Sequence, residues 1–437
     1  MAENPPPQPA PAPTGEATPI GWSLSHRVFF RWMFCYFLLY TLPSRGRVGL
    51  VPMEGAYRRF WEPLVTWVAI HVFHLSGHAT TYFPTGSGDT TLNYVENYCY
   101  VVMAFAGTIV WSLLDRKRTD YVTLHSWFRI WIRFTLAATL LAYGFAKVFP
   151  LQMQMQMTTM IERWGDFSPM AALWNFMGAS TPYTILSGSA EALAGLLLLF
   201  RRTTLLGAMI SFGVMFNVAA LNYCYDVPVK LYSTNLVLMS VFLIAPDARR
   251  LTQLLLLNRP ALPANLSRPE LPRLWMRIVA RIVWVVVALG VILYGTVHES
   301  WIAYKAVYLN PQHPPIYGLY EVESFTSNGT NAPPILTDTT RWRWLYFNSY
   351  GYVRVVSVND DSKWYGANQE AAKKTVTLSS DQATNVFTYS WGDTNHVVLR
   401  GSMAGNALEV SLHKLAPTNF LLLNRGFHWI NEYPLNR

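Results

Sequence analysis

Residues 183–226 read YTILSGSAEALAGLLLLFRRTTLLGAMISFGVMFNVAALNYCYD. This stretch contains two long apolar runs joined by Arg201 and Arg202, with a single acid, Glu191, near the middle of the first run. Crossing a hydrocarbon core of about 30 Å takes roughly 17–25 helical residues, and each run is about that long. The stretch therefore predicts two consecutive transmembrane helices, one of which carries a buried carboxyl group.

The composition extends this interpretation to most of the chain. Of the 437 residues, 51% are hydrophobic and only 14% are charged, which is typical of a polytopic membrane protein. The net charge of +9 is explained by basic residues beside the apolar runs, so we expect no nucleic-acid partner. The cysteines, Cys35, Cys99 and Cys224, lie in predicted spans and form no CxxC pair. Their positions exclude a disulfide framework and a thioredoxin-type site.

Apolar periodicity predicts a membrane all-α helical bundle. Residues 4–19 are Pro-rich and are expected to be disordered. Residues 64–76, between Pro63 and Gly77, are apolar but too short to cross, and they predict an interfacial or re-entrant helix. Seven spans are predicted, at 24–42, 96–114, 126–148, 183–200, 203–225, 230–246 and 274–297.

Loop charges predict the orientation of these spans. Basic clusters follow the second, fourth and sixth spans, at 116–118, 201–202 and 249–250, and all three then lie on one side. That side is expected to be cytoplasmic. The chain is therefore predicted to be a multi-pass protein of a bacterial inner membrane, with a cytoplasmic amino terminus. Arg45, Arg47, Arg58 and Arg59 fall on the opposite side, so the first span fits this scheme least well.

The residues after 310 have a different texture and predict an all-β domain. Alternating segments are separated by turn-rich pieces such as SNGTN and WGDTN, which indicates a small antiparallel barrel or sandwich on the periplasmic side. Two roles are open for the tryptophans of this domain: they line a ligand cavity, or they belong to the core of the barrel. These residues are Trp342, Trp344, Trp391 and Trp429. The eight expected strands are YGLYEVESF, RWRWLYFN, GYVRVVSV, KTVTLSS, NVFTYSW, HVVLRGS, LEVSLHKL and FLLLNRGFHW.

Polar residues collect toward the predicted outer half of the bundle. Glu191 is expected about 12 Å below the outer surface, and Asn217 at a similar depth. The expected catalytic residues are Glu191, Lys147 and Tyr143, and the expected cofactor-binding residues are Asn217, Asn222 and Asn235. An intramembrane carboxyl group usually faces a cavity or a partner. For the asparagines, hydrogen bonding between helices at about 0.6 kcal/mol per contact is an equal alternative.

No local pattern in the sequence predicts the distance between Lys147 and Glu191. If both helices end at the same level, the axial offset is up to about 12 Å. Direct contact would then need a tilted helix, a long lysine reach or a bridging water.

Two shorter motifs suggest further sites. His71, His74 and His78 would lie within an arc of roughly 60° if one helix held all three, which suits a metal ion or a proton relay. The alternatives are the polar face of an interfacial helix without a ligand, and a helix that ends at Gly77. TGSGDT at 85–90 suggests either an anion-binding backbone nest or a turn in which Asp89 caps the following helix.

The segments GSAEALAGLLLLFRRTTLLGAMIS (188–211) and YGFAKVFP (143–150) resemble the DoxX-like membrane family. The resemblance covers residues 126–250 and implies a four-helix core, a link to quinone-dependent thiosulfate oxidation, and roles for Lys147 and Glu191. The opening YGLYEVESF and the late NRGFHW of the β-domain resemble lipocalins.

The expected organisation is a tail (1–22), amino-terminal helices (23–125), a DoxX-like core (126–250), a loop with the last span (251–300) and the β-domain (301–437). We expect a redox component that binds a quinone or another lipophile among membrane lipids, with Glu191 exchanging protons. The second hypothesis is a non-enzymatic module that binds a ligand or an envelope partner through the lipocalin-like domain. A third is a carboxylase-like or other transferase that uses His71, His74 or Lys147 as base.

Overall fold

The computed structural model of the protein describes residues 21–42, 54–82, 85–263, 271–381 and 383–435. The predicted disordered tail at 4–19 lies outside these residues, as do Arg45 and Arg47.

The chain divides into two compact units, which are described separately. The first comprises Met1–Thr139, Ala194–Ala219 and Pro228–Ala288, and the second comprises Leu140–Leu193, Ala220–Val227 and Leu289–Arg437.

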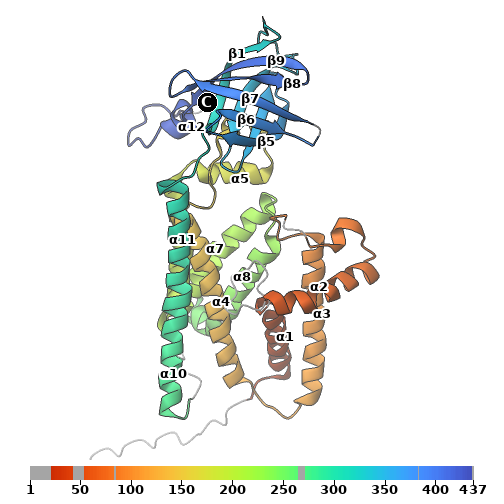
Figure 1. Ribbon diagram of the computed structural model, residues 1–437. Helices are drawn as coiled ribbons and strands as arrows, with labels where there is room; N and C mark the ends of the chain where they lie inside the picture. The colour runs from red at the N-terminus through yellow and green to blue at the C-terminus, as the bar shows by residue number, and fades with distance from the viewer. Residues whose placement is uncertain (1–20, 43–53, 83–84, 264–270, 382, 436–437) are drawn as a thin grey trace, which may run out of the picture. The chain divides into compact units, whose positions relative to one another are not determined.

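Up to residue 309, the regular structure of the described residues consists of helices (Figure 1). Their bounds are α1 Leu24–Thr41, α2 Glu54–His71, α3 Thr91–Leu114, α4 Val122–Val148, α5 Pro169–Gly178, α6 Thr181–Leu199, α7 Thr204–Cys224, α8 Lys230–Ile244, α9 Ala248–Leu251, α10 Leu274–Val285 and α11 Gly295–Tyr304. Wider π-type turns at Val286–Tyr294 and Lys305–Leu309 make Leu274–Leu309 one continuous helix.

The described residues contain five helices that are long and apolar enough to cross a membrane, in place of the seven predicted spans. They are Thr91–Leu114, Thr181–Leu199, Arg201–Cys224, Lys230–Leu256 and Leu274–Leu309. The other two predicted spans form helices α1 and α4, but charged residues such as Arg31 and Arg133 lower their mean hydropathy. The predicted helical region is thus confirmed, and its long apolar helices are typical of a membrane protein.

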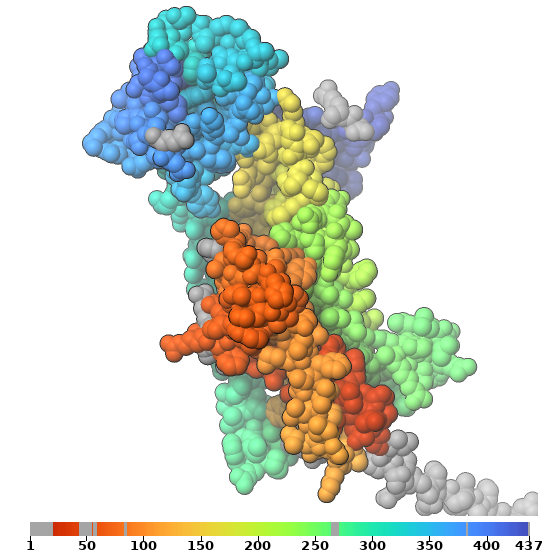
Figure 2. All heavy atoms as spheres, turned by 90° about the vertical axis from the view of Figure 1, so that its right-hand side faces the viewer, coloured from red at the N-terminus to blue at the C-terminus, as the bar shows by residue number. Residues whose placement is uncertain are grey.

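The candidate spans leave much apolar surface uncovered by protein. Only 11–44% of the residues in the most apolar stretch of each helix are buried. On α3, which lies at the surface in Figure 2, Val102, Phe105, Ile109 and Leu113 are all exposed. Such faces are suited to contact with lipid chains, which need no polar partner.

Helix α2 departs from the prediction of a short helix starting after Pro63. It runs from Glu54 through Pro63 to His71. A proline removes one backbone hydrogen bond and favours a kink. Here packing outweighs that cost, because Trp61, Val65 and Ala69 recur every fourth residue and are all buried.

Asp89 caps a different helix from the one predicted. Thr90 caps α3, with reciprocal hydrogen bonds to Asn93. The Asp89 carboxylate instead accepts hydrogen bonds from the backbone N–H groups of Lys230 and Leu231, at 2.6 and 3.0 Å, at the start of α8. A carboxylate at a helix amino terminus satisfies otherwise unpaired donors and complements the helix dipole. The contact therefore joins two distant segments of the first unit.

The carboxy-terminal domain is a closed eight-stranded antiparallel barrel (Figure 1). Each strand pairs with the next in sequence, and β1 pairs with β9 to close the barrel, while β2 only extends a hairpin from β1. The strands are β1 Gly318–Ser327, β2 Thr330–Asn331, β3 Trp342–Phe347, β4 Tyr352–Ser357, β5 Ser362–Glu370, β6 Thr375–Ser379, β7 Thr384–Trp391, β8 His396–Met403 and β9 Asn406–Leu415; the short helix α12, Leu421–Asn424, follows.

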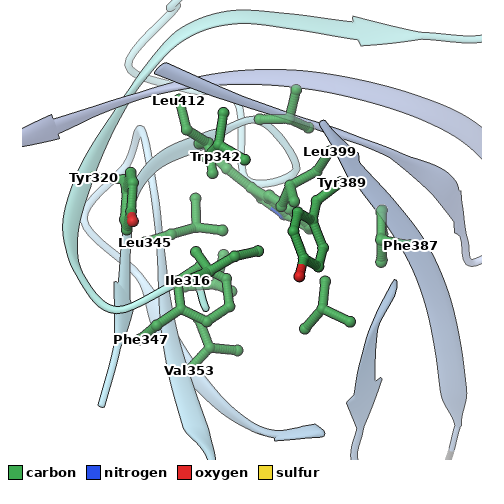
Figure 3. Packing of buried hydrophobic residues seen from close by; sticks show 14 of the residues in the cluster. Ile316, Tyr320, Trp342, Leu345, Phe347, Val353, Phe387, Tyr389, Leu399 and Leu412 are labelled. Atoms are coloured by element: carbon green, nitrogen blue, oxygen red, sulfur yellow. The ribbon is translucent and has the colours of Figure 1, made fainter. Parts of the chain in front are cut away.

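Side chains fill the interior of this barrel. Trp342, Phe347, Phe387 and Tyr389 point toward one another from β3 and β7, together with aliphatic residues of the other strands (Figure 3). Burial raises the pKa of Tyr320 to about 12, so this phenol stays neutral in the core. A packed interior of this kind leaves the outer wall of the barrel as its polar surface.

The closed barrel has the predicted number of eight strands, but one strand was predicted at the wrong place. Strand β5 was missed, because SKWYGANQE is poor in β-branched residues. FLLLNRGFHW, which was predicted as a strand, contains the helical turn α12 and no strand. Trp342 is in the core as expected, whereas Trp391 is 39% and Trp429 is 91% exposed, so the prediction of a core position is wrong for both.

The β7–β8 contact depends on the absence of a side chain at Gly401. A Cβ atom there would lie 2.5 Å from the Val386 carbonyl oxygen and 2.6 Å from Cδ1 of Phe387. We expect Gly401→Ala to destabilise the barrel by about 1–3 kcal/mol, because the strand or the ring must move. Pulse proteolysis of the full-length protein in denaturant measures this. Gly392→Ala is the control, since its Cβ would meet atoms only at 3.8 Å; equal midpoints for the two variants would contradict the packing argument.

Candidate functional site

The second unit contains a buried ion pair between Lys147 and Glu191. Lys147 lies in the last turn of α4, and Glu191 lies near the middle of α6. The lysine Nζ atom donates to both carboxylate oxygens, at 2.7 and 2.8 Å. The two side chains are only 7% and 1% exposed. Two of the expected catalytic residues are therefore in direct contact.

Glycines place the two charges within reach of each other. Gly144 and Gly188 each lie one turn before the charged residue of their helix. A Cβ atom on Gly188 would be 2.5 Å from the Lys147 Cβ and 2.6 Å from the Gly144 carbonyl oxygen. Small residues let helix backbones approach this closely in membrane proteins. The Lys147 side chain consequently starts beside the backbone of α6 and follows it to Glu191.

The predicted axial offset does not arise, because its premise was wrong. The offset of about 12 Å assumes that the end of α4 is level with the start of α6. In the structure, the backbone nitrogen of Val148, the last residue of α4, lies beside Gly188, which is seven residues into α6. Helix α6 therefore extends beyond α4 by about 10 Å. This overhang brings Glu191 to the level of the Lys147 side chain without a bridging water.

The Lys147 ammonium group has a third N–H donor, in addition to the two that point at Glu191. An ammonium group has three N–H donors, and two of those on Lys147 point at Glu191. The Nζ atom also lies 6.0 Å from the ring centroid of Tyr143, at the outer limit of a cation–π contact. Tyr143 is 37% exposed, so it forms the accessible flank of the pair. The arrangement can hold a polar group and exchange a proton beside an apolar surface.

The three asparagines predicted to bind a cofactor have different surroundings. Asn217 is exposed in the first unit. Asn235, also in the first unit, is buried and accepts a hydrogen bond from Tyr36 at 2.8 Å, which is the interhelical contact given as its alternative role. Asn222 belongs to the second unit and is buried, and its Nδ2 atom has no hydrogen-bond partner among the described residues.

The helical premise for a metal site at His71, His74 and His78 is wrong. Helix α2 ends at His71, whose ring stacks on Trp67. His74 has a φ of 53°, and the N–H of Leu75 reaches back to the carbonyl of Ala69, which is the geometry of a helix carboxy-terminal cap. All three histidines are exposed, and they share no single helix.

Two polar clusters escaped the sequence reasoning. Arg31 of α1 is buried and donates to the Ser112 and Tyr121 hydroxyls, and Tyr121 donates to Asp115. The position of Arg31 inside an apolar run was the one feature of the sequence that pointed to this cluster. The second cluster, Glu323, His396 and His413, has ligand atoms within 4.8 Å of one another. No local motif marks it, because the three residues come from three strands.

Comparison with known proteins identifies one relative. The chain is 33% identical over an alignment of 127 residues to the uncharacterized protein YwoB of Bacillus subtilis strain 168, and the match covers 27% of this chain and 75% of YwoB. The chain therefore belongs to the same protein family as YwoB. No protein-family model and no solved structure matches it. The resemblances to DoxX-like proteins and to lipocalins stay predictions.

The ion pair predicts a characteristic pattern of stability changes. Lys147→Met leaves the Glu191 charge buried without its partner, which costs about 3–5 kcal/mol. The double variant Lys147→Met, Glu191→Leu replaces both charges by apolar groups of similar size and should recover most of that loss. Unfolding of the full-length protein in a single detergent measures both. Ser240→Ala, which removes one buried hydroxyl contact to Ser211, is the neutral-pair control at about 1 kcal/mol.

If the double variant is as unstable as Lys147→Met alone, the two charges do not compensate each other, and the assignment of a coupled pair fails.

Proposed function

We propose that this relative of YwoB is a membrane redox component that binds a quinone or a similar lipophile at Lys147 and Glu191. The observation that carries the proposal is a fully buried ion pair that includes Glu191, within the candidate membrane span α6. Ionisable groups at such positions are costly and usually functional. A buried salt bridge is also a poor source of stability, since apolar replacements often do as well. Function is thus the better reason for its presence.

The chemistry of the pair fits a carbonyl-containing lipophile. A quinone takes up two electrons and two protons when it becomes a quinol, so its site needs a hydrogen-bond donor to a carbonyl oxygen and a group that exchanges protons. Lys147 supplies the donor, Glu191 the exchanging carboxyl and Tyr143 the apolar flank beside them. The electrons come from a separate reductant, since the proposed residues contribute only positioning and protons.

The proposed location is a bacterial inner membrane with a cytoplasmic amino terminus and a periplasmic barrel. Support comes from the basic residues that follow spans, such as Arg201 and Arg202 between α6 and α7. Arg249 and Arg250, after α8, fall on the same side by alternation.

A second candidate is a binding module for an envelope partner, as one observation favours it. Phe427, Trp429 and Tyr433, after the barrel, are 76–91% exposed. Exposed aromatic residues of this kind are enriched where proteins meet partners. Because side chains fill the barrel interior, such binding would use its outer surface.

Titration of a short-chain benzoquinone into the full-length protein in lipid nanodiscs tests the redox proposal. We expect Glu191→Gln to weaken binding at least tenfold, which corresponds to about 1.4 kcal/mol, because the amide cannot exchange a proton or balance the Lys147 charge. The folded double variant Lys147→Met, Glu191→Leu should not bind. Ser240→Ala and Trp429→Ser should bind as the unaltered protein does.

Unchanged quinone affinity in a folded double variant would refute the site. Loss of quinone binding only in Trp429→Ser would move the ligand site to the exposed aromatic residues after the barrel.

A further inference from the structure

We propose that Glu323, His396 and His413 bind a divalent transition-metal ion such as Zn²⁺ on the outer wall of the β-barrel. This site is independent of the ion pair in the helices and of the function proposed for it. The three residues come from the neighbouring strands β1, β9 and β8, and their ligand atoms lie within 4.8 Å of one another.

Strand register brings the two histidines together. His396 on β8 and His413 on β9 are directly paired residues. Their neighbours Val397 and Leu412 point into the core, so both imidazoles point outward. The rings stack with centroids 4.8 Å apart and an interplanar angle of 14°.

A β-bulge brings the carboxylate to the same place. In β1 the register with β9 shifts between Val322 and Ser324, which makes Glu323 the extra residue. Val322 and Phe325 are buried, whereas Glu323 and Ser324 between them are both exposed. Bulges commonly re-aim a side chain in this way. The Glu323 Oε1 atom consequently lies 3.5 Å from Nε2 of His396, across the intervening strand β9.

His396 is held in the orientation that a metal ligand needs. Its Nδ1 atom lies 2.8 Å from Oδ2 of Asp393. Asp393 is itself fixed by the backbone N–H groups of Asn395 and His396, at 2.7 and 2.9 Å. A proton on Nδ1 leaves the lone pair of Nε2 directed toward Glu323. Such carboxylate–histidine contacts behind a metal ligand fix the tautomer and raise the basicity of the ring.

The spacing and the donor set suit zinc. Bonds of about 2.0–2.1 Å at a tetrahedral ion separate ligand atoms by about 3.4 Å. The Nε2–Oε1 separation of 3.5 Å already matches this value. The ligand atoms of all three residues lie within 4.8 Å of one another. Closing the widest gap takes about 1.4 Å, which partly exposed side chains can achieve.

Two imidazoles and one carboxylate leave a coordination position open. Sites with three protein ligands keep that position for water or a ligand. Glu323 also lines a surface hollow of about 490 Å³ together with Glu321, Arg341 and Arg343. The open position would therefore be reached from solvent beside this hollow, and not from the filled barrel interior.

Metal titration of the full-length, tag-free protein tests the proposal, after chelator treatment and dialysis. Isothermal titration with Zn²⁺ alone should give one equivalent per chain, and Co²⁺ should give the visible spectrum of a tetrahedral N,O site. The variant His396→Ala, His413→Ala should lose at least 100-fold in affinity. Asp393→Asn, which keeps all three ligands, should lose about 10–100-fold.

Matched histidine variants exclude other sources of binding. His428→Ala in the same domain, and the joint replacement of His71, His74 and His78 by alanine, should leave the one-equivalent phase unchanged. Since the substituted residues lie on the outer wall, circular dichroism should confirm an intact barrel. No binding by the unaltered protein, or equal binding by the His396→Ala, His413→Ala variant, would overturn the proposal.

Discussion

The close backbone approach at Gly144 and Gly188 is the constraint on which the candidate site in the helices depends. With a methyl group at Gly188, the Cβ atom would lie 2.5 Å from the Lys147 Cβ, and α4 and α6 would have to separate. Separation would open the contact between Lys147 and Glu191 in a medium of low polarity. There each unpaired charge carries a desolvation penalty of several kcal/mol. The ion pair therefore depends on the close packing of α4 and α6, which Gly144 and Gly188 permit.

In the barrel, closure of the sheet provides partners for the backbone polar groups. Each strand pairs with its sequence neighbour, and the β1–β9 ladder removes the free edges that would otherwise attract other chains. The core then takes one face of every strand, so polar side chains are sorted to the outer wall. The bulge at Glu323 adds an outward residue without moving Val322 or Phe325 out of the core. A cluster of side chains able to bind a metal can thus exist on a barrel whose interior is filled.

Local signals predicted the classes of element well and their contacts poorly. Apolar runs predicted the helices, and alternation with turns predicted an eight-stranded domain. Strand β5 was missed because SKWYGANQE has little intrinsic strand preference, and its pairing with β4 and β6 decides its structure. The sequence marked Glu191 and Lys147 as unusual, but only the overhang of α6 beyond α4 shows that they touch. The helix that Asp89 caps and the Glu323–His396–His413 cluster could not be predicted, because residues far apart in the chain create both contacts.

Closure by β1 and β9 also sets an order of events during synthesis. The last ladder cannot form until β9, Asn406–Leu415, has been made. At 5–20 residues per second, translation from Gly318 to Leu415 takes on the order of 5–20 s. Throughout that interval the apolar helices have already been synthesised. The edge of β1 that later pairs with β9 can form hydrogen bonds only with other chains or with chaperones. The nascent protein is therefore most exposed to mispairing in the seconds before its barrel closes.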